Sequence, residues 1–381
     1  MVPLVIFWTC VGVILFTYAG YPLLLWVLVL LGPRPSIPEM SDWPALTILI
    51  VAFNEEDRIA RKITNLLACD YPADKLELIV CSDGSTDNTN GIVSEYGDPR
   101  VRLAASPTNI GVNDAFAMGV QQTSNDLLLL TDSYTEFAPD ALKKAIRHFA
   151  DPKVGMVAGQ IVYLNPLKTA VGSGYRAYWL IETGVRCLEG RLGVATVVVG
   201  SSEFLRRAAY IHVPSRYDND IAAPMYANSL GFLCRCEPES VQHTIQKKTP
   251  AQDLRRRIRM AIRGWSSVPY ILGIVPFRRN LKGWLALACH KYLRWSTWLF
   301  MIAALAACIP LAAGGLFYLT VLGLQVMFYA AVLAGWMLSG LGVRARLLWL
   351  PFYFCLLQAA GMIGLIHALS GRQVGAWKPS K

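Results

Sequence analysis

The feature that most constrains the fold of this chain is a regular alternation of apolar runs and amphipathic segments that begins at Leu46. Apolar runs of strand length occur at 46–52, 76–82, 101–105, 126–131 and 154–159. Helices are expected in the segments between them, at 55–68, 86–96, 113–123 and 139–149. Apolar strands that alternate with helices form a mostly parallel sheet that is covered on both faces. The sequence therefore predicts an α/β domain.

Beyond these repeats the pattern is less regular. A helix is expected near 174–189, then a strand at 194–199, a helix around 220–230 and a strand at 232–236. Residues 251–274 set five arginines among apolar side chains, which is the composition of a basic amphipathic helix that lies in a membrane interface. The α/β domain is therefore expected to cover residues 43–245.

Acidic loops follow two neighbouring strands of the predicted sheet. Ser82–Asp87 follows the second strand, and Thr131–Glu136 follows the fourth. In an open α/β sheet, ligands bind beyond the carboxyl ends of the strands, so both loops point to one nucleotide site. A carboxylate such as Asp132 beside a diphosphate suits Mg²⁺ or Mn²⁺. Taken alone, each loop also fits an ordinary turn, and Asn54 after the first strand also fits a helix N-cap.

The two ends of the chain are far more apolar than its middle. The 381 residues are 54% hydrophobic and 16% charged, with a mean hydropathy of +0.38, which is typical of a protein with membrane-spanning helices. Residues 3–31 are long enough for one such helix. Further apolar runs near the C-terminus reach the same length, at about 295–313, 315–338 and 347–369. One of these three runs is equally compatible with a re-entrant or interfacial segment.

These observations divide the chain into five parts. An N-terminal transmembrane helix (1–32) precedes the α/β domain, and interfacial helices (250–292), C-terminal transmembrane helices (293–370) and a polar tail (371–381) follow it. With the α/β domain in the cytoplasm, Arg344 and Arg346 also lie in the cytoplasm, as the positive-inside rule favours.

The net charge of +10 fits a domain that faces anionic lipids and phosphate substrates. No zinc-finger spacing or separate basic arm supports nucleic-acid binding. The nine cysteines form no CxxC pair, and they are expected to be reduced thiols in a reducing compartment.

Several short motifs occur together in this sequence. They include Val51–Glu56, Asp83–Asp87, Asn109–Gly111, Asp132, Phe149–Gly155, Asp218–Asp220 and Arg256–Arg263. As a set they resemble the family 2 glycosyltransferases, in particular the membrane-embedded, polysaccharide-synthase-like branch. The resemblance implies a GT-A fold, which is a Rossmann-like sheet, and inverting transfer of a sugar from a nucleotide sugar, with UDP as the expected nucleotide.

The resemblance also implies roles for individual residues. Asp83 and Glu55 would hold the uridine, with Asn54 and Gly111 in the same nucleotide-binding loops. Asp132 would belong to the metal–diphosphate motif, with Glu136 as its second metal ligand for Mg²⁺ or Mn²⁺. Asp220 matches the catalytic base, which takes the proton of the acceptor hydroxyl. Arg259 and Arg263 match a basic motif that contacts the diphosphate and stabilises the charge on the departing nucleotide.

Four positions depart from the family pattern. Tyr134 replaces the second acidic residue of the metal motif, and a protonated phenol is a poor ligand for Mg²⁺. Val112 replaces a lysine, Asn219 replaces the acidic residue before the base, and Gly264 replaces a tryptophan. These departures motivate an alternative, in which the chain is a catalytically weak subunit with a structural or regulatory role in a polysaccharide-secretion complex.

The leading expectation is an inner-membrane, multi-pass glycosyltransferase of exopolysaccharide or glycolipid synthesis. Its acceptor would be a glycan or a lipid-linked sugar held at the membrane surface, in contact with membrane lipids. Processive synthesis and single transfer both remain open. A transporter is disfavoured, because the apolar segments lack the ionisable residues of a substrate pathway.

Overall fold

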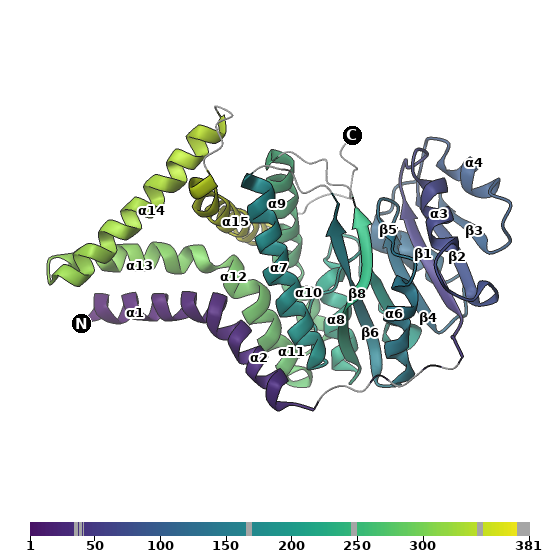
Figure 1. Ribbon diagram of the computed structural model, residues 1–381, viewed down its shortest axis with the longest axis horizontal. Coiled ribbons are helices and arrows are strands. Elements are labelled where there is room, and N and C mark those ends of the chain that lie inside the picture. The colour runs from purple at the N-terminus through teal and green to yellow at the C-terminus, as the bar shows by residue number, and fades with distance from the viewer. Residues whose placement is uncertain are drawn as a thin grey trace.

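The computed structural model describes residues 1–33, 37, 40, 42–164, 170–244, 250–340 and 346–371. An eight-stranded sheet forms one side of the molecule, and an arm of long helices extends from the other (Figure 1). The helices α7 (Ala170–Arg191) and α9 (Pro250–Ser266) stand between the two parts. The predicted positions of Arg344 and of tail residues 372–381 lie outside the described residues.

The first half of the sheet is parallel, as expected from the sequence. Its strands run in the order β3-β2-β1-β4, and each pairs in parallel with its neighbour. They cover β1 (Leu46–Ala52), β2 (Leu76–Asp83), β3 (Val101–Ser106) and β4 (Leu127–Asp132). The carboxyl ends of these strands therefore meet along one edge, where the acidic loops begin.

The second half of the sheet is mixed, but β6 and β8 pair in parallel, so most strand pairs of the described sheet are parallel, as expected. The order continues from β4 through β7-β6-β8-β5, with antiparallel pairs on both sides of β7 and between β5 and β8. These strands are β5 (Glu136–Phe137), β6 (Val154–Tyr163), β7 (Glu203–Arg206) and β8 (Leu233–Thr244).

A predicted strand at 194–199 is wrong. This segment is buried and apolar, but it makes a single isolated bridge, from Val194 to Cys234. Its N–H groups form hydrogen bonds outside a strand ladder. For example, the N–H of Val198 donates to the backbone oxygen of Asp220 at 2.9 Å. The backbone of this segment thus bonds to β8 at one point and to the start of α8 (Asn219–Ser229), rather than to a continuous ladder.

Helices cover both faces of the sheet and give it two cores. On one face, Ile48 and Ile50 of β1 pack with Ile63 of α3, and on the other face Leu49 packs with Phe116 of α5. Because alternate residues of a strand point to opposite faces, both sets are buried and the strand is apolar throughout. Fully burying each such side chain contributes about 1.5–3 kcal/mol. The covering helices are α3 (Ile59–Leu67), α4 (Thr89–Ser94), α5 (Val112–Val120), α6 (Ala141–Ile146) and α8 (Asn219–Ser229).

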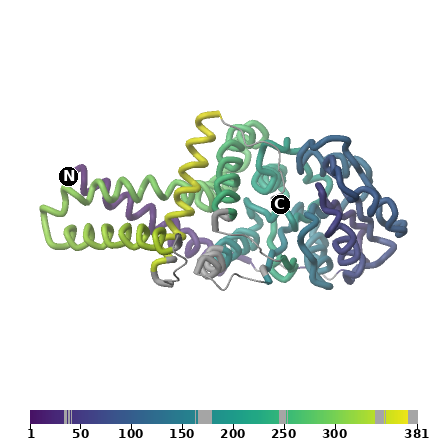
Figure 2. Tube along the Cα trace, turned by 90° about the horizontal axis from the view of Figure 1, so that it is seen from above, coloured from purple at the N-terminus to yellow at the C-terminus, as the bar shows by residue number. Residues whose placement is uncertain are grey.

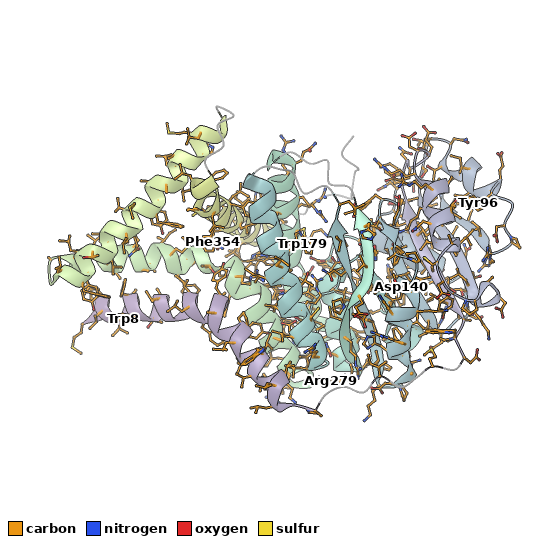
Figure 3. All side chains as sticks on the ribbon, in the orientation of Figure 1. Trp8, Tyr96, Asp140, Trp179, Arg279 and Phe354 are labelled. Atoms are coloured by element: carbon orange, nitrogen blue, oxygen red, sulfur yellow. The ribbon has the colours of Figure 1, made fainter. Side chains whose placement is uncertain are left out.

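The arm consists of apolar helices from both ends of the chain, as Figure 2 shows from above. Trp8 and Phe354 lie on this arm, on the opposite side of the molecule from Tyr96 (Figure 3). Its helices are α1 (Val2–Leu15), α2 (Tyr21–Leu31), α13 (Thr297–Ala312), α14 (Leu316–Gly340) and α15 (Arg346–Leu369), with a π-helical turn at Phe16–Gly20.

Three described segments of the arm are long and apolar enough to cross a membrane: Val2–Leu31, Leu316–Leu338 and Leu350–Leu369. A fourth candidate is the pair Leu281–Trp295 and Thr297–Ala312, which is bent by 58° as a broken span or a re-entrant loop would be. The bend falls within the first of the C-terminal apolar runs, for which the sequence left both interpretations open.

The basic segment 251–274 forms two helices rather than one, α9 and α10 (Val268–Ile274). The break lies at Ser267, just before the proline in the first turn of α10. Ser267 Oγ also accepts from the N–H of Asp218 at 2.8 Å, which ties the break to the start of α8. The connection to the arm continues through α11 (Leu281–Leu287), a π-helical turn (Ala288–Tyr292) and α12 (Leu293–Trp295).

Candidate active site

The loops after β1 and β2 are joined through Asn54. Asn54 has a left-handed backbone (φ 54°), a conformation that asparagine tolerates better than most residues. Its Oδ1 accepts from the N–H of Thr86 at 2.8 Å, and its own N–H donates to Ser85 Oγ at 3.1 Å. Since α3 starts five residues later, with Arg58 as its N-cap, Asn54 links the two predicted nucleotide loops rather than capping the helix.

Asp83 is fully buried, and its carboxylate is occupied within the protein. Oδ1 accepts from the N–H groups of Ile110 (2.6 Å) and Gly111 (3.0 Å), while Oδ2 accepts from Asn109 Nδ2 at 3.0 Å. Gly84 packs so closely on this turn that a Cβ there would lie 2.4 Å from the Thr108 carbonyl carbon. Asp83 thus holds the 109–111 turn beside the end of β2, which brings the predicted residue Gly111 to the same edge.

Glu55 is also engaged inside the fold. Its side chain is 4% exposed and forms an ion pair with Arg58 at 2.9 Å. Its N–H donates to Thr89 Oγ1 at 2.8 Å. Glu55 therefore lies at the same edge of the sheet, where it connects the loop after β1 to the first turn of α4.

Asp132 is held at the end of β4 by its own loop. Its Oδ1 accepts from the N–H (3.1 Å) and the Oγ1 (2.8 Å) of Thr135. Beneath the loop lies the ammonium group of Lys62, which is 1% exposed and donates to Thr131 Oγ1 at 3.1 Å and to the Thr135 backbone oxygen at 2.7 Å. A buried cation thus fixes the shape of the turn that presents Asp132.

The other predicted metal ligand, Glu136, points to a different partner. It forms an ion pair with Arg61 at 2.5 Å. Within the described residues, no group of three or more His, Cys, Asp or Glu side chains is arranged to hold a metal ion. Asp132 alone still fits a divalent metal, because Mg²⁺ is commonly bound by one or two carboxylates together with the phosphates of a substrate.

Next to Asp132 the described residues form a pocket of about 230 Å³. Its walls come from the loop after β4, from α7, from the 197–201 segment and from α8, α9 and α12. The pocket's charged lining residues are Asp132, Glu182, Arg186, Asp218, Asp220, Arg256, Arg257 and Lys291, and Trp179 and Trp295 add aromatic walls.

Asp220 is half-buried in this pocket, in the first turn of α8. The helix is capped by Asp218, whose side chain accepts from the N–H of Asp220 at 3.2 Å, so Asp220 itself is free of a capping role. The glycine at position 200 leaves room for Asp220, since a Cβ there would lie 2.6 Å from Asp220 Oδ1.

Burial, and then the nearby charge of Asp218, raise the pKa of Asp220 to about 7. Positive charges on Arg263, Arg186 and Lys291 oppose this rise. A carboxylate whose pKa lies near neutral pH is suited to accept a proton from a hydroxyl group.

Asn219 and Glu203 extend the support of Asp220. Asn219 Nδ2 donates to Glu203 Oε2 at 2.8 Å, which ties α8 to β7. Glu203 is 1% exposed, and burial together with Asp220 raises its pKa well above the ordinary value. Asn219, at the position where the family has an acidic residue, thus joins α8 to the sheet.

The predicted arginines lie beside the pocket rather than in its lining. Arg263 donates to the backbone oxygen of Tyr217 at 2.5 Å, just before the cap of α8. Arg259 is partly buried, and burial, followed by the charges of Arg256 and Arg263, lowers its pKa. The arginines of α9 that line the pocket are Arg256 and Arg257.

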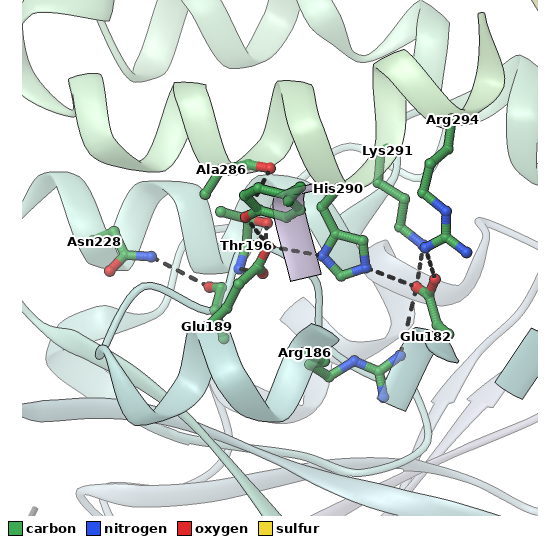
Figure 4. A network of polar contacts seen from close by, with 11 residues as sticks. Glu182, Arg186, Glu189, Thr196, Asn228, Ala286, His290, Lys291 and Arg294 are labelled. Carbon is green, nitrogen blue, oxygen red and sulfur yellow. Dashed lines mark hydrogen bonds and ion pairs between the residues drawn. The ribbon is translucent and has the colours of Figure 1, made fainter. Parts of the chain in front are cut away.

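Three pocket residues, Glu182, Arg186 and Lys291, belong to a buried polar network (Figure 4). Glu182 of α7, 2% exposed, accepts from Lys291 Nζ at 2.5 Å and from Arg294 at 2.8 Å. His290 lies between two carboxylates, 3.2 Å from Glu182 and 3.0 Å from Glu189. Several cations thus surround Glu182, and the network holds Lys291 at the pocket wall.

Two polar atoms at the pocket have no hydrogen-bond partner within the part of the chain that the structure describes. Among the described residues, Arg186 Nε and Ser201 Oγ are buried without a hydrogen bond. Arg186 is 2% exposed and its guanidinium lies 3.8 Å from Glu182, while Ser201 is 4% exposed. Buried donors are normally satisfied, so both groups are available to a bound molecule.

Lys62, Glu182, Arg186 and Lys291 were not singled out from the sequence. One sequence pattern was available for Lys62: it lies between Ile59, Ile63 and Leu66, on the apolar face of its helix. Glu182 and Arg186 are one turn apart on α7, but Lys291 joins them only through contacts between α7 and the segment around 290, which are far apart in the chain.

Comparisons with known proteins agree with this geometry. The family model "Glycosyl transferase family 2" matches residues 47–213. An N-acetylglucosaminyltransferase from Mesorhizobium japonicum is 28% identical over 59% of this chain and 57% of its own length. A poly-beta-1,6-N-acetyl-D-glucosamine synthase from Staphylococcus aureus is 24% identical over 61% of this chain and 57% of its own length. The chain thus spans less than two thirds of these relatives.

The fold has a solved counterpart. A mannosyltransferase from Pyrobaculum calidifontis, determined in complex with GDP-Man and Mn²⁺, superposes with a TM-score of 0.69. It is 21% identical, and the match covers 96% of this chain and 99% of that one. Residues 47–213 therefore resemble the family 2 glycosyltransferases, and the chain has the GT-A-like fold of the mannosyltransferase, joined to helices that are long and apolar enough to cross a membrane.

Proposed function

We propose that the protein is an inverting glycosyltransferase that transfers a sugar from a nucleotide sugar to a glycan or lipid-linked acceptor at the cytoplasmic face of the inner membrane. The observation that carries this proposal is the position of Asp220 in a pocket that opens next to Asp132. Such a transfer needs a base for the acceptor hydroxyl, and Asp220, with a pKa near 7, suits that role. It also needs a group near the donor's diphosphate, and Asp132 suits that role.

In this mechanism the donor lies along the edge formed by the ends of β1, β2 and β4. The loops held together by Asn54, Glu55 and Asp83 receive the nucleoside, and Gly111 borders the same site. Asp83 acts mainly by holding the 109–111 turn, since its oxygens are already bonded there. Asp132 would hold Mg²⁺ or Mn²⁺, which when bound would neutralise charge on the diphosphate.

The acceptor hydroxyl enters the pocket beside Asp220. Its oxygen attacks C1 of the donor sugar while the bond from C1 to the diphosphate oxygen breaks, and Asp220 takes the hydroxyl proton. Attack from the face opposite the leaving group inverts the configuration at C1. Arg256 and Arg257 in the pocket lining, supported by Arg259 and Arg263, stabilise the charge on the leaving diphosphate.

We expect the acceptor to bind the pocket donors that make no hydrogen bond among the described residues. Arg186 Nε and Ser201 Oγ are positioned to bond oxygen atoms of the acceptor, and Trp179 and Trp295 offer apolar surface to a sugar ring. Contacts of this kind orient a hydroxyl group for attack and account for part of the rate.

The relatives' names make N-acetylglucosamine the first sugar to test, here on UDP as the expected nucleotide, whereas the structural counterpart was determined with GDP-Man. The test is a screen of purified full-length protein with radiolabelled UDP- and GDP-sugars, with and without Mn²⁺. Transfer or hydrolysis of one UDP-sugar supports the proposal. No turnover of any donor would contradict it and favour a structural or regulatory subunit, an alternative that Glu136's ion pair with Arg61 also suits.

The metal assignment has its own test. Asp132→Ala should weaken UDP binding in the presence of Mn²⁺ and leave the metal-free affinity nearly unchanged, as measured by calorimetric titration. Glu136→Ala, in the same loop, should show whether a second carboxylate contributes. Unchanged Mn²⁺ dependence in Asp132→Ala would remove Asp132 from the metal site.

A further inference from the structure

Two cysteines from distant parts of the chain meet outside the candidate active site. Cys187 lies near the end of α7, and Cys236 lies in β8. Their sulfur atoms are 2.6 Å apart, and both residues are half-buried. Each of the nine cysteines is a free thiol. For the other seven, no described contact places a second cysteine sulfur within hydrogen-bond distance.

The packing of α7 on β8 brings these sulfurs together. Gly190, three residues after Cys187, rests directly on the strand: a Cβ there would lie 2.5 Å from the Cys236 backbone nitrogen and 2.9 Å from its Cβ. The absence of a side chain at position 190 therefore allows the helix to approach the strand closely. This approach sets the distance between the two thiols.

The surroundings also favour reaction at one of the two sulfurs. A hydrogen bond from the Cys236 thiol, followed by the positive charges of Arg186 and Arg191, lowers the pKa of Cys187. Thiolates rather than thiols are the nucleophiles in disulfide exchange, so Cys187 is the attacking sulfur of the pair.

We propose that Cys187 and Cys236 form a modification site at which a low-molecular-weight disulfide introduces an intramolecular disulfide between α7 and β8. The Cys187 thiolate attacks one sulfur of oxidised glutathione, and one glutathione thiolate leaves. Cys236 then loses its proton and attacks the Cys187 sulfur, which releases the second glutathione. The two protein sulfurs are oxidised to a disulfide, one glutathione disulfide is reduced to one thiol and one thiolate, and the proton of the Cys236 thiol passes to a leaving glutathione thiolate.

The bond would fix the helix that carries part of the pocket. Arg186 adjoins Cys187 in the sequence, and Glu182 and Glu189 lie on the same helix. Oxidation would join this end of α7 to the sheet, while reduction would leave packing alone to hold it. The proposal does not depend on which reaction the pocket catalyses.

The test uses full-length protein in detergent, incubated with oxidised glutathione or with dithiothreitol. Remaining thiols are then alkylated under denaturing conditions, and the peptides are identified by mass spectrometry. We expect a cross-linked peptide pair joining Cys187 to Cys236 in the oxidised sample, absent after dithiothreitol. We also expect the oxidised protein to melt at a higher temperature than the reduced protein.

Matched variants make the result specific. Cys234→Ser, two residues away on the same strand, should retain the cross-link, and Cys187→Ser and Cys236→Ser should each lose both it and the melting shift. Full alkylation of both cysteines after oxidation would overturn the proposal. A glutathione adduct on one of them with the other free would also overturn it, because the second step would then not occur.

Discussion

Asp220 is held by a backbone contact and by its neighbours' charges. Its backbone oxygen accepts from Val198, in a loop that the sequence suggested as a strand. Burial and then the charge of Asp218 raise the pKa of Asp220, while the positive charges of Arg263, Arg186 and Lys291 lower it. These groups come from three different parts of the chain. The pKa of Asp220 therefore depends on the correct assembly of the whole pocket.

A pH profile tests this environment. Asp220 must be ionised to accept a proton, and its raised pKa means that the ionised fraction is lost as pH falls below about 7. We therefore expect the transfer rate at saturating substrates to fall about tenfold per pH unit below that midpoint and to level off above it. A profile that stays flat through neutral pH would contradict this assignment.

The same midpoint should move when a neighbouring charge is removed. Arg186→Gln removes a cation that favours the ionised form, so the midpoint should shift to higher pH, and the acceptor KM should rise because a pocket donor is lost. Arg191→Gln, an exposed arginine of the same helix, is the control and should change neither quantity. Equal effects of both substitutions would indicate a general disturbance of α7.

At the level of the secondary-structure elements, buried ion pairs connect β8 to the helical turn that carries Arg147 and His148. Glu237 is 5% exposed and accepts from Arg147 at 2.7 Å, and His148 Nε2 lies 2.8 Å away. Burial alone would raise the pKa of Glu237, but hydrogen bonds with His148 and Arg147 outweigh it and lower the pKa to about 2.

Glu237→Gln should therefore destabilise the fold at neutral pH. A carboxylate whose pKa falls on folding contributes stability above its ordinary pKa of 4.5 and loses it as pH drops toward about 2. The free energy of unfolding should decrease by about 2 kcal/mol at pH 7. The difference from wild type should shrink on acidification, as measured by denaturant titration. Equal destabilisation at neutral and acid pH would rule out the charge as the cause.

How far sequence predicts structure differs from element to element. The strand at 46–52 was located correctly, because both of its faces are buried and the apolar run is continuous. Residues 194–199 are just as apolar, yet they form a loop, because their backbone partners lie in α8 and β8. The apolar composition of 194–199 correctly predicts that the segment is buried. It does not predict which groups its backbone bonds to.

The candidate site shows the same limit. Asp220 and Asp132 were found from local motifs, and both line one pocket. The ion pair of Glu136 with Arg61 and the pocket position of Lys291 depend on side chains brought together from other elements. Such contacts leave no periodic pattern in a single sequence.

At the scale of the whole molecule, buried carboxylates of α7 connect the arm of apolar helices to the pocket. Glu189 accepts from the hydroxyl of Tyr21, in the N-terminal helix, at 2.6 Å. Glu182 binds Lys291 and Arg294, which lead into the C-terminal helices. The apolar helices of both chain ends, which are long enough to cross a membrane, thus meet the helix that lines the pocket.

Tyr21→Phe tests this connection. Removal of the hydroxyl leaves Glu189 with one fewer donor, and we expect a loss of about 1 kcal/mol in stability and a lower melting temperature in detergent. A double-mutant cycle with Glu189→Gln isolates the pair, since the two substitutions should be less than additive. Full additivity would show that the contact does not couple the N-terminal helix to α7.

The central claim is that Asp220 is the base of a sugar transfer, and Asp220→Asn tests it most directly. The account predicts that transfer from a radiolabelled UDP-sugar falls by about 10²–10⁴-fold while the Kd for UDP, measured by calorimetric titration, stays close to wild type. Asp126→Asn, a carboxylate that is 61% exposed, should leave both unchanged. An Asp220→Asn protein that retains near-normal transfer would contradict the account, because the proton would then be taken elsewhere.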